Sequence, residues 1–279
     1  MKRKIFFLIL LGLLFSSPAQ SQEIRVMTYN IKYDNTRDTV NNWEDRKSAM
    51  VRLIQYYLPQ VLGVQEALHR QVDYLDKALP SYAYVGVGRD DGAQKGEYAA
   101  LFYDSAKLHV ERSNTFWLSE TPEQVSVGWD AALERICTYA LFRHTESQKR
   151  FWVFNAHFDH RGKQAREKSA QLILERIREL NKNNLPVVLM GDLNLAPETP
   201  PILEIKEQME DGLETAQRPF YGPLGTFNGF DPDRVLDRRI DYIFVRNAKV
   251  MEYLHIDDRM ANSKHISDHL PVSCVLSLP

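Results

Sequence analysis

The sequence has little cysteine, no excess of basic residues and no second long apolar run after its N-terminus. Cys137 and Cys274 are its only cysteines, and each lies in an apolar stretch typical of a strand. Export would permit a disulfide between them, but the sequence is equally compatible with two buried free thiols. The formal charge is −2 at pH 7, which argues against a generally basic nucleic-acid-binding protein.

The N-terminal residues have the layout of a secretory signal peptide. Basic residues at positions 2–4 precede an apolar run over 5–15, and small residues follow. The run is too short to span a bilayer comfortably as a helix. Ala19 and Ser21 stand at positions −3 and −1 of a cut after residue 21. We therefore expect residues 1–21 to be removed, which would leave an exported chain without a transmembrane segment.

Residues 22–279 have the length and composition of one domain. Removing 21 of the 279 residues leaves 258, and the chain is 44% hydrophobic and 26% charged, which suits one large core. Without the three basic residues of the signal, the formal charge is near −5. No repeat, low-complexity tract or linker interrupts the chain. We expect a single domain and take a monomer as its state.

Short apolar strands alternate with amphipathic helices at first, and further strands follow. Helical periodicity covers 43–57 and 164–180. Strand patterns cover 24–31, 61–66, 136–144, 151–155, 187–191, 240–245 and 270–278. Strands outnumber helices, so the sequence favours a mixed or antiparallel pair of sheets with helices outside over a doubly wound parallel sheet.

Many of these strands end in acids, amides or histidines. The residues are Asn30, Glu66, Asn155, His157, Asp159, His160, Asp192, Asn194, Asp241, Asp268 and His269. One of them alone would be explained by turn chemistry, but so many beside strands indicate a site. Clustered carboxylates repel one another unless a cation compensates. Oxygen ligands of this kind favour Mg²⁺, with Mn²⁺ as an alternative, because these ions keep waters and share phosphate oxygens.

Zinc is the competing interpretation of the HFDH stretch, where His157, Asp159 and His160 could be ligands. A zinc site would need more histidine or cysteine close by in the fold, and the two cysteines have no metal-ligand spacing. We therefore predict a hard divalent ion.

In this order, the stretches TYNI, QE, NAHFDH, GDLN, RIDYIF and SDHLPV resemble the endonuclease/exonuclease/phosphatase superfamily, and NAHFDHRGKQAR resembles its secreted bacterial members. The resemblance extends from Val26 to Val275. It implies a four-layer α/β/β/α sandwich of two mixed, mainly antiparallel sheets, like that of DNase I, with the active site at one rim. It also implies a metal-dependent hydrolase of phosphate esters.

The resemblance further implies the roles of the metal and water ligands. Glu66 is similar to the principal metal-binding carboxylate, with Asn30 and Asp268 as further ligands of the metal or its waters. Asp192 corresponds to the acid that orients or deprotonates the attacking water. Asn194 corresponds to the amide that positions the phosphate and that acid.

The remaining roles concern the phosphate. His269, paired with Asp241, would carry a raised pKa and stabilise charge on the phosphoryl oxygens. His157 matches a histidine aimed at the phosphate. Whether Asp192 or His269 is the general base stays open. Three more residues are candidate substrate contacts: Asn155, Arg135 and Arg161.

We therefore expect an exported Mg²⁺-dependent hydrolase of diesters or monoesters, acting on a small, lipid-linked or sugar-linked phosphate. An extracellular nuclease is the alternative among enzymes, although a chain without a basic run is ill suited to tight duplex binding. A non-catalytic phosphate-binding protein on the same fold is the alternative of another class. The presence of Glu66, Asp192 and His269 disfavours it.

Overall fold

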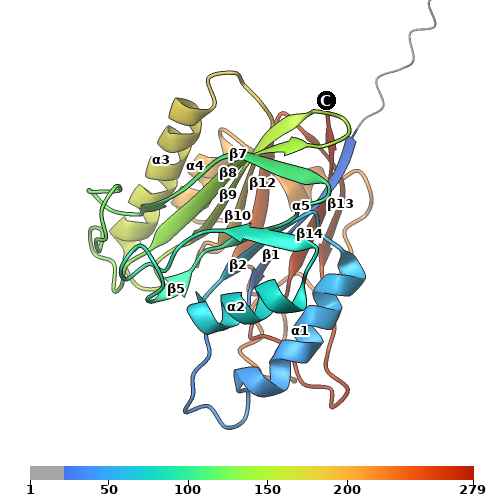
Figure 1. Cartoon of the computed structure of the whole chain (residues 1–279). Helices are drawn as coiled ribbons and strands as arrows, with labels where there is room; N and C mark the ends of the chain where they lie inside the picture. The colour runs from blue at the N-terminus through green and yellow to red at the C-terminus, as the bar shows by residue number, and fades with distance from the viewer. Residues whose placement is uncertain (1–21) are drawn as a thin grey trace, which may run out of the picture.

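The structure is a computed structural model that describes residues 22–279, and the expected signal peptide, 1–21, lies outside the described residues. Two six-stranded sheets face each other, and helices cover the outer face of each sheet (Figure 1). This arrangement confirms the predicted α/β/β/α sandwich. Within residues 22–279, no helix combines the length and hydropathy that crossing a membrane would require.

The first sheet has the strand order β13-β14-β1-β2-β6-β4. Its strands are β1 (Gln22–Asn30), β2 (Val61–Gln65), β4 (Tyr82–Val85), β6 (Leu101–Asp104), β13 (Lys249–His255) and β14 (Val272–Leu278). Only β1 and β2 pair in parallel, and the other neighbours are antiparallel. Its outer face is covered by helices α1 (Trp43–Tyr57) and α2 (His69–Ala78).

The second sheet has the order β11-β12-β10-β9-β8-β7. Its strands are β7 (Leu108–Trp117), β8 (Ile136–His144), β9 (Arg150–His157), β10 (Val187–Asp192), β11 (Glu210–Asp211) and β12 (Asp241–Arg246). Here β9 and β10 form the single parallel pair. Helices α3 (Lys163–Leu180) and α4 (Pro200–Lys206) cover it, a short α5 (Gly212–Thr215) follows, and β3 (Ala67–Leu68) pairs with β5 (Glu97–Tyr98) apart from both sheets.

The sheets bury their facing sides against each other because alternate residues of each strand point inward. Val26 of β1, Val153 of β9 and Met190 of β10 belong to this central layer. Cys274 lies in it, whereas Cys137 faces α3 in the outer layer, and both cysteines are free. The two thiols therefore do not form the disulfide that export would permit.

Local sequence explains the best predicted helix. Asn42 is the N-cap of α1, and its side chain accepts a hydrogen bond from Asp45 N. Met50, Leu53 and Ile54 are buried against the first sheet. Predicted and observed bounds of this helix agree. The sequence patterns did not predict β4, β6, β7 or β13, and β7 and β13 are edge strands that lack the buried alternation.

Candidate active site

The first sheet brings four polar residues to one rim. Asn30 ends β1, and Glu66 follows β2, which runs parallel to β1, so the two residues leave the sheet on the same side. Asp268 and His269 come shortly before β14, whose antiparallel pairing with β1 returns the chain to that rim. Glu66 has a left-handed backbone, with φ of 60°, a strained conformation that often marks a functional residue.

The second sheet supplies the opposite wall of the rim. Asp192 at the end of β10 is aligned with His157 at the end of β9 and with Asp241 at the start of β12. Gly191 makes this alignment feasible, because its φ is 144° and a Cβ there would lie 1.9 Å from Ala156 O. The glycine of the GDLN stretch thus lets β10 approach β9 closely where the site begins.

Four carboxylates gather at the rim, and we call them the acid cluster: Glu66, Asp192, Asp241 and Asp268. Two cationic side chains lie among them. Lys32 Nζ is 3.3 Å from Glu66 Oε2 and 3.6 Å from Asp268 Oδ2. His269 Nδ1 is 2.9 Å from Asp241 Oδ2, and its Nε2 is 3.7 Å from Asp192 Oδ2. When all four acids are ionised, the two cations leave an excess of two negative charges, which one divalent cation would balance.

His269 is held as an imidazolium. Burial lowers the pKa of the ring, but the carboxylates of Asp241 and Asp192 outweigh it and raise the pKa to about 10. Asp241 Oδ2 also accepts a 2.5 Å hydrogen bond from Thr226 Oγ1. The ring of Phe227 packs edge-on against His269, with centroids 5.1 Å apart. The predicted dyad of Asp241 and His269 is therefore present and rigidly supported.

The pKa of Asp192 is also raised, but here burial is the largest cause of the rise. Burial raises it to about 7, although the nearby His269 opposes the rise. One oxygen, Oδ2, accepts a 2.9 Å hydrogen bond from Asn30 Nδ2, and the other accepts the N–H of Asn194. Asn194 has φ of 50°, and its side-chain Nδ2 donates a hydrogen bond to Phe158 O. These contacts fix the Asp192 carboxylate among the other members of the acid cluster, and its role in orienting water stays a prediction.

Asn30 orients two carboxylates of the site through its side-chain amide. Its Nδ2 donates to Glu66 Oε1 at 3.1 Å as well as to Asp192, and its Oδ1 accepts the N–H of Lys32. The amide thus presents its donor side to the acids and orients them, and the role of Asn30 as a ligand of the metal or its waters stays a prediction. Burial raises the pKa of Glu66, but Lys32 and His269 outweigh it and lower the pKa overall.

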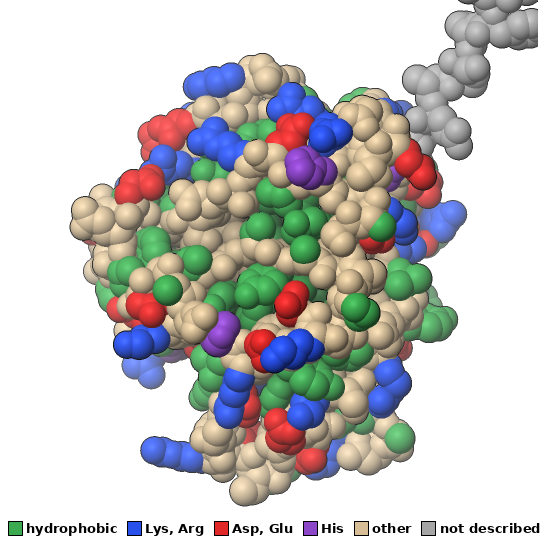
Figure 2. Space-filling model, in the orientation of Figure 1, with side chains coloured by type: hydrophobic (Ala, Val, Ile, Leu, Met, Phe, Trp, Pro, Cys, Tyr) green, Lys and Arg blue, Asp and Glu red, His purple; other side chains and the backbone are tan. Residues whose placement is uncertain are grey.

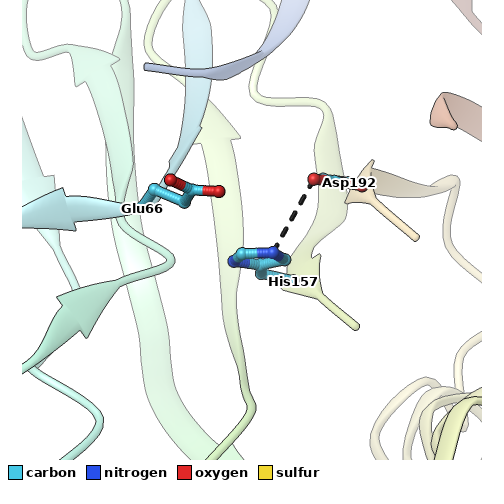
Figure 3. Close-up of side chains that lie close together, drawn as sticks. All are labelled: Glu66, His157 and Asp192. Carbon is cyan, nitrogen blue, oxygen red and sulfur yellow. Dashed lines mark ion pairs between the residues drawn. The ribbon is translucent and has the colours of Figure 1, made fainter. Parts of the chain in front are cut away.

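His157 completes a triangle with Glu66 and Asp192, whose nearest ligand atoms all lie within 4.8 Å of one another (Figure 3). Its Nε2 is 3.7 Å from Asp192 Oδ2. Burial lowers the pKa of His157 far below its ordinary value, and Arg135 and Arg89 reinforce this. A neutral ring offers one N–H donor and one acceptor nitrogen.

Arg135, a predicted substrate contact, lies beside His157. Its Nη1 is 3.1 Å from both ring nitrogens of His157, and its Nε donates to Asp159 at 3.3 Å. The guanidinium is almost fully buried, with 4% of its side chain exposed. Arg161 is exposed, and among the described residues its side chain makes no hydrogen bond or ion pair of its own. Arg135 therefore borders the site, whereas no side-chain contact within residues 22–279 brings Arg161 to it.

The structure contradicts the prediction that Asn155 binds substrate. Its Nδ2 donates to Val64 O and Ala100 O, and its Oδ1 accepts from Gln65 Nε2 at 2.6 Å. The side chain is fully buried between the two sheets. Asn155 shares a face of β9 with His157 but lies one step deeper, so it joins the sheets beneath the site and has no access to a ligand.

The zinc interpretation of the HFDH stretch also fails. The carboxylate oxygens of Asp159 accept hydrogen bonds from the backbone N–H groups of Arg161 and Gly162 and from Arg135 Nε. His160 Nδ1 lies 2.9 Å from Arg135 Nη2, so a guanidinium stands among the proposed ligands. In residues 22–279, the groups with metal-ligand geometry are instead those around Asp192.

Sequence reasoning missed several residues of the rim. Glu97 accepts two hydrogen bonds from Arg89, at 2.6 and 3.0 Å, and its Oε2 lies 3.7 Å from His157 Nδ1. Lys32 immediately follows the TYNI stretch, and Phe227 lies in a loop without a strand pattern. Only Lys32 offered a signal, through its position two residues after Asn30.

The site fits a divalent cation on its own chemistry. Its ligands are mainly carboxylate oxygens, and the acid cluster has an uncompensated negative charge. Glu66 and Asp268 are the more exposed members, with 14% and 10% of their side chains accessible, against 2% for Asp192 and 1% for Asp241. An ion at the first two would retain contact with solvent water.

Comparisons with known proteins agree with this geometry. The Endonuclease/Exonuclease/phosphatase family model matches residues 27–269. A family structure from Bacteroides vulgatus is 39% identical, with a TM-score of 0.88, over 92% of this chain and 100% of that one. The mannosyl-6-phosphatase Bt3783 of Bacteroides thetaiotaomicron is 36% identical, with a TM-score of 0.86, over 91% and 100%.

A more distant relative comes from a virus. Uncharacterized protein L388 of Acanthamoeba polyphaga mimivirus is 30% identical over 163 residues, which cover 56% of this chain and 60% of that protein. The match thus spans less than two thirds of the viral protein. The family model covers most of the chain, and the bacterial structures superpose over nearly all of the described fold. The chain belongs to the endonuclease/exonuclease/phosphatase family of phosphoester hydrolases.

Proposed function

We propose that this chain is an exported, divalent-metal-dependent phosphomonoesterase that acts on phosphorylated sugars. The observation that carries the hydrolytic chemistry is His269, held between Asp241 and Asp192 beside the Glu66 carboxylate. The sugar phosphate is supported by the likeness to the Bacteroides thetaiotaomicron mannosyl-6-phosphatase.

Asp192 is the general base in this proposal. Its Oδ2 faces the rings of His157 and His269, each 3.7 Å away, and Asn30 holds it in place. His269 cannot accept the proton of the attacking water, because two carboxylates keep it protonated. Its charge instead stabilises the phosphoryl oxygens as negative charge develops on them. A pKa of about 7 suits Asp192 for proton transfer near neutrality.

Glu66 and Asp268 would hold the metal ion, which we propose to be Mg²⁺, with Mn²⁺ as an alternative. Both carboxylates reach the solvent edge, where a hard ion can keep part of its water shell. When bound, the ion offsets charge on the phosphate and activates water.

Cationic and donor side chains around the rim favour a monoester. A phosphate monoester carries nearly two negative charges at neutral pH, whereas a diester carries one. Arg135 and His269 are cationic donors, although each also pairs with acids, and neutral His157 in contact with Arg135 provides an N–H donor. These groups match a dianion better than a singly charged diester.

The loop before β12 forms a wall that suits a sugar. Phe227 contacts His269, and the guanidinium carbons of Arg234 and Arg238 lie 5.2 and 4.9 Å from its ring centroid. Both arginines are exposed. An aromatic ring flanked by donors can contact the hydroxyl-rich part of a sugar phosphate. On the face drawn in Figure 2, basic and acidic side chains are interspersed, which disfavours the nuclease alternative.

A lipid-linked phosphate is a second candidate, and it rests on the same loop. Tyr221, Leu224 and Val235 are 77%, 67% and 76% exposed. Exposed apolar side chains near an active site can contact a lipid surface. Hydrolysis of phospholipid headgroups in vesicles, at a rate above that of a soluble sugar phosphate, would favour this candidate.

A substrate panel tests the proposal. We would compare p-nitrophenyl phosphate, bis-p-nitrophenyl phosphate, mannose 6-phosphate and single-stranded DNA, each with Mg²⁺, Mn²⁺, Ca²⁺ or EDTA. We expect kcat/KM for monoesters to exceed that for the diester by at least ~100-fold, and His269→Ala to abolish turnover. The exposed β7 residue His109 provides the control, since His109→Ala should behave as wild type. Preference for the diester or DNA would contradict the proposal.

Export is proposed from the layout of residues 1–21. Expression of the full chain in a bacterial host, followed by fractionation and N-terminal sequencing, tests it. We expect the protein outside the cytoplasm with a new N-terminus at residue 22. Retention of the intact chain in the cytoplasm would contradict export.

A further inference from the structure

Lys32 lies inside the acid cluster without a role in the chemistry described above. Its ammonium group bridges Glu66 and Asp268, the two residues proposed to hold the metal ion. It approaches one oxygen of each, Oε2 of Glu66 and Oδ2 of Asp268. Oε1 of Glu66 instead faces Asn30, and Oδ1 of Asp268 lies 3.4 Å from Ser267 Oγ. Each acid therefore keeps one oxygen away from the lysine.

The backbone of Lys32 is held in a strained conformation that directs this side chain. Its φ is 57°, in the left-handed region, which costs a non-glycine residue about 1 kcal/mol or more. Arg46 and Gln71, both buried, donate hydrogen bonds of 3.2 and 3.0 Å to Lys32 O. Its N–H donates to Asn30 Oδ1 at 3.1 Å. Contacts from three side chains thus stabilise a backbone that would otherwise be unfavourable.

The side chain is also supported at its tip. Lys32 Nζ lies 4.5 Å from the centroid of the Tyr33 ring, a cation–π contact. About 29% of the side chain is exposed, so the ammonium stands at the mouth of the site. The ammonium group lies between the two carboxylates, at a position that a second divalent ion would need in order to bind both.

We propose that Lys32 is a built-in cation of the metal site, which neutralises one side of the Glu66–Asp268 pair and so limits the site to a single divalent ion. The proposal rests on the metal dependence proposed above. Its geometric basis is that Lys32 and His269 are each shared between two acids, so that with all four acids ionised two negative charges remain, which one divalent ion balances. Lys32 is a positioning residue in this proposal, since it acts through the ligands.

Metal binding by the purified protein tests this directly. We would measure bound Mn²⁺ by equilibrium dialysis and by electron paramagnetic resonance for wild type, Lys32→Met and Lys32→Arg. We expect one ion in wild type and in the arginine variant, which keeps the charge. We expect two ions in Lys32→Met, with the first bound ~10-fold more tightly, because a repelling charge has been removed. Lys77, paired with Asp73 on α2, provides the matched control, and Lys77→Met should bind one ion.

Thermal unfolding gives a second readout that does not depend on turnover. In EDTA, Lys32→Met should unfold a few degrees below wild type, because the two acids are left uncompensated. Excess Mn²⁺ should raise its unfolding temperature more than that of wild type.

The outcomes are distinct. Two ions bound to wild type would overturn the proposal even if no variant folded. A single ion with unchanged affinity in Lys32→Met would also overturn it. No bound ion in wild type would overturn the proposed metal dependence, and the Lys32 proposal along with it.

Discussion

Replacing Asp241 with asparagine isolates the charge that holds His269 protonated. Asp241 is buried, and its Oδ2 accepts hydrogen bonds from His269 Nδ1 and Thr226 Oγ1. Asparagine keeps the size of the side chain and one carbonyl oxygen for these donors. It removes the negative charge and places an amide where Asp241 Oδ1 has no hydrogen-bond partner.

The expected change in the pKa of His269 can be worked out from the geometry of the site. The rise in the pKa of His269 from 6.5 to about 10 corresponds to ~5 kcal/mol between the two protonation states. Asp241 is the larger attractive cause and lies at 2.9 Å, against 3.7 Å for Asp192. If it supplies at least half of this energy, Asp241→Asn lowers the pKa of His269 to ~8 or below.

Two assays measure the effect. Titration of the His269 ring by nuclear magnetic resonance gives the pKa, with the signal assigned by its loss in His269→Ala. The pH profile of kcat should show its descending limb move from near 10 to ~8, so that the deficit of the variant grows about tenfold per pH unit above 8. Asp257→Asn, beside His265 outside the rim, is the matched control. A His269 pKa that stays above 9 in Asp241→Asn would refute the electrostatic account.

The free energy of unfolding should also depend on the protonation of His269. A raised pKa in the folded state stabilises the fold fully below the unfolded pKa of ~6.5 and loses that contribution as pH rises through about 10. The difference in unfolding free energy between wild type and Asp241→Asn should therefore be largest below pH ~8, where both His269 rings are protonated in the folded state, and should shrink between ~8 and about 10. A gap that widens with pH would contradict the sign of this reasoning.

Four further predictions concern the rim and the layer beneath it. Glu66→Gln should lower kcat by at least ~1,000-fold and weaken Mn²⁺ binding, because it removes a ligand charge; unchanged binding in dialysis would count against the ligand role. Asn155→Ala should destabilise the fold by ~2–3 kcal/mol in urea unfolding, since Val64 O, Ala100 O and Gln65 Nε2 each lose a buried hydrogen bond; a large rise in KM without destabilisation would restore a substrate role. Arg135→Lys should raise KM for a monoester ~10-fold or more with a smaller effect on kcat, because lysine cannot reproduce the guanidinium contacts with His157 and Asp159; a proportional loss for the diester would contradict the proposed charge recognition. The ascending limb of the kcat/KM profile should lie near pH 7 at low metal concentration and move to lower pH as the concentration rises, because a cation favours the charged form of Asp192; a limb that moves upward would contradict this.

Strand-end chemistry made much of the site predictable from sequence. Glu66, Asp192 and His269 each adjoin a short apolar strand, and parallel pairing brings the ends of such strands to one edge. The strand pattern could not show how far each polar side chain lies from the rim. Asn155 and His157 point the same way from β9, but only His157 reaches the rim. Depth depends on where the facing sheet ends, which no local pattern indicates.

Other residues of the rim depend on backbone conformations and distant contacts. The Lys32 side chain points into the acid cluster because its backbone is left-handed, a conformation that sequence patterns do not predict for a residue other than glycine. Glu97 lies in a two-residue strand, and it meets His157 only because β3 and β5 pair beside the rim. The edge strand β7 escaped prediction because four consecutive residues in its middle are exposed.

The most direct test of the central claim is the release of inorganic phosphate from mannose 6-phosphate by the purified protein, in Mg²⁺ and in EDTA. The account predicts turnover in Mg²⁺ that stops in EDTA, returns when Mg²⁺ is restored and is absent in Glu66→Gln. Phosphate release that persists in EDTA, or that Glu66→Gln retains, would contradict a metal-dependent phosphomonoesterase built on this acid cluster.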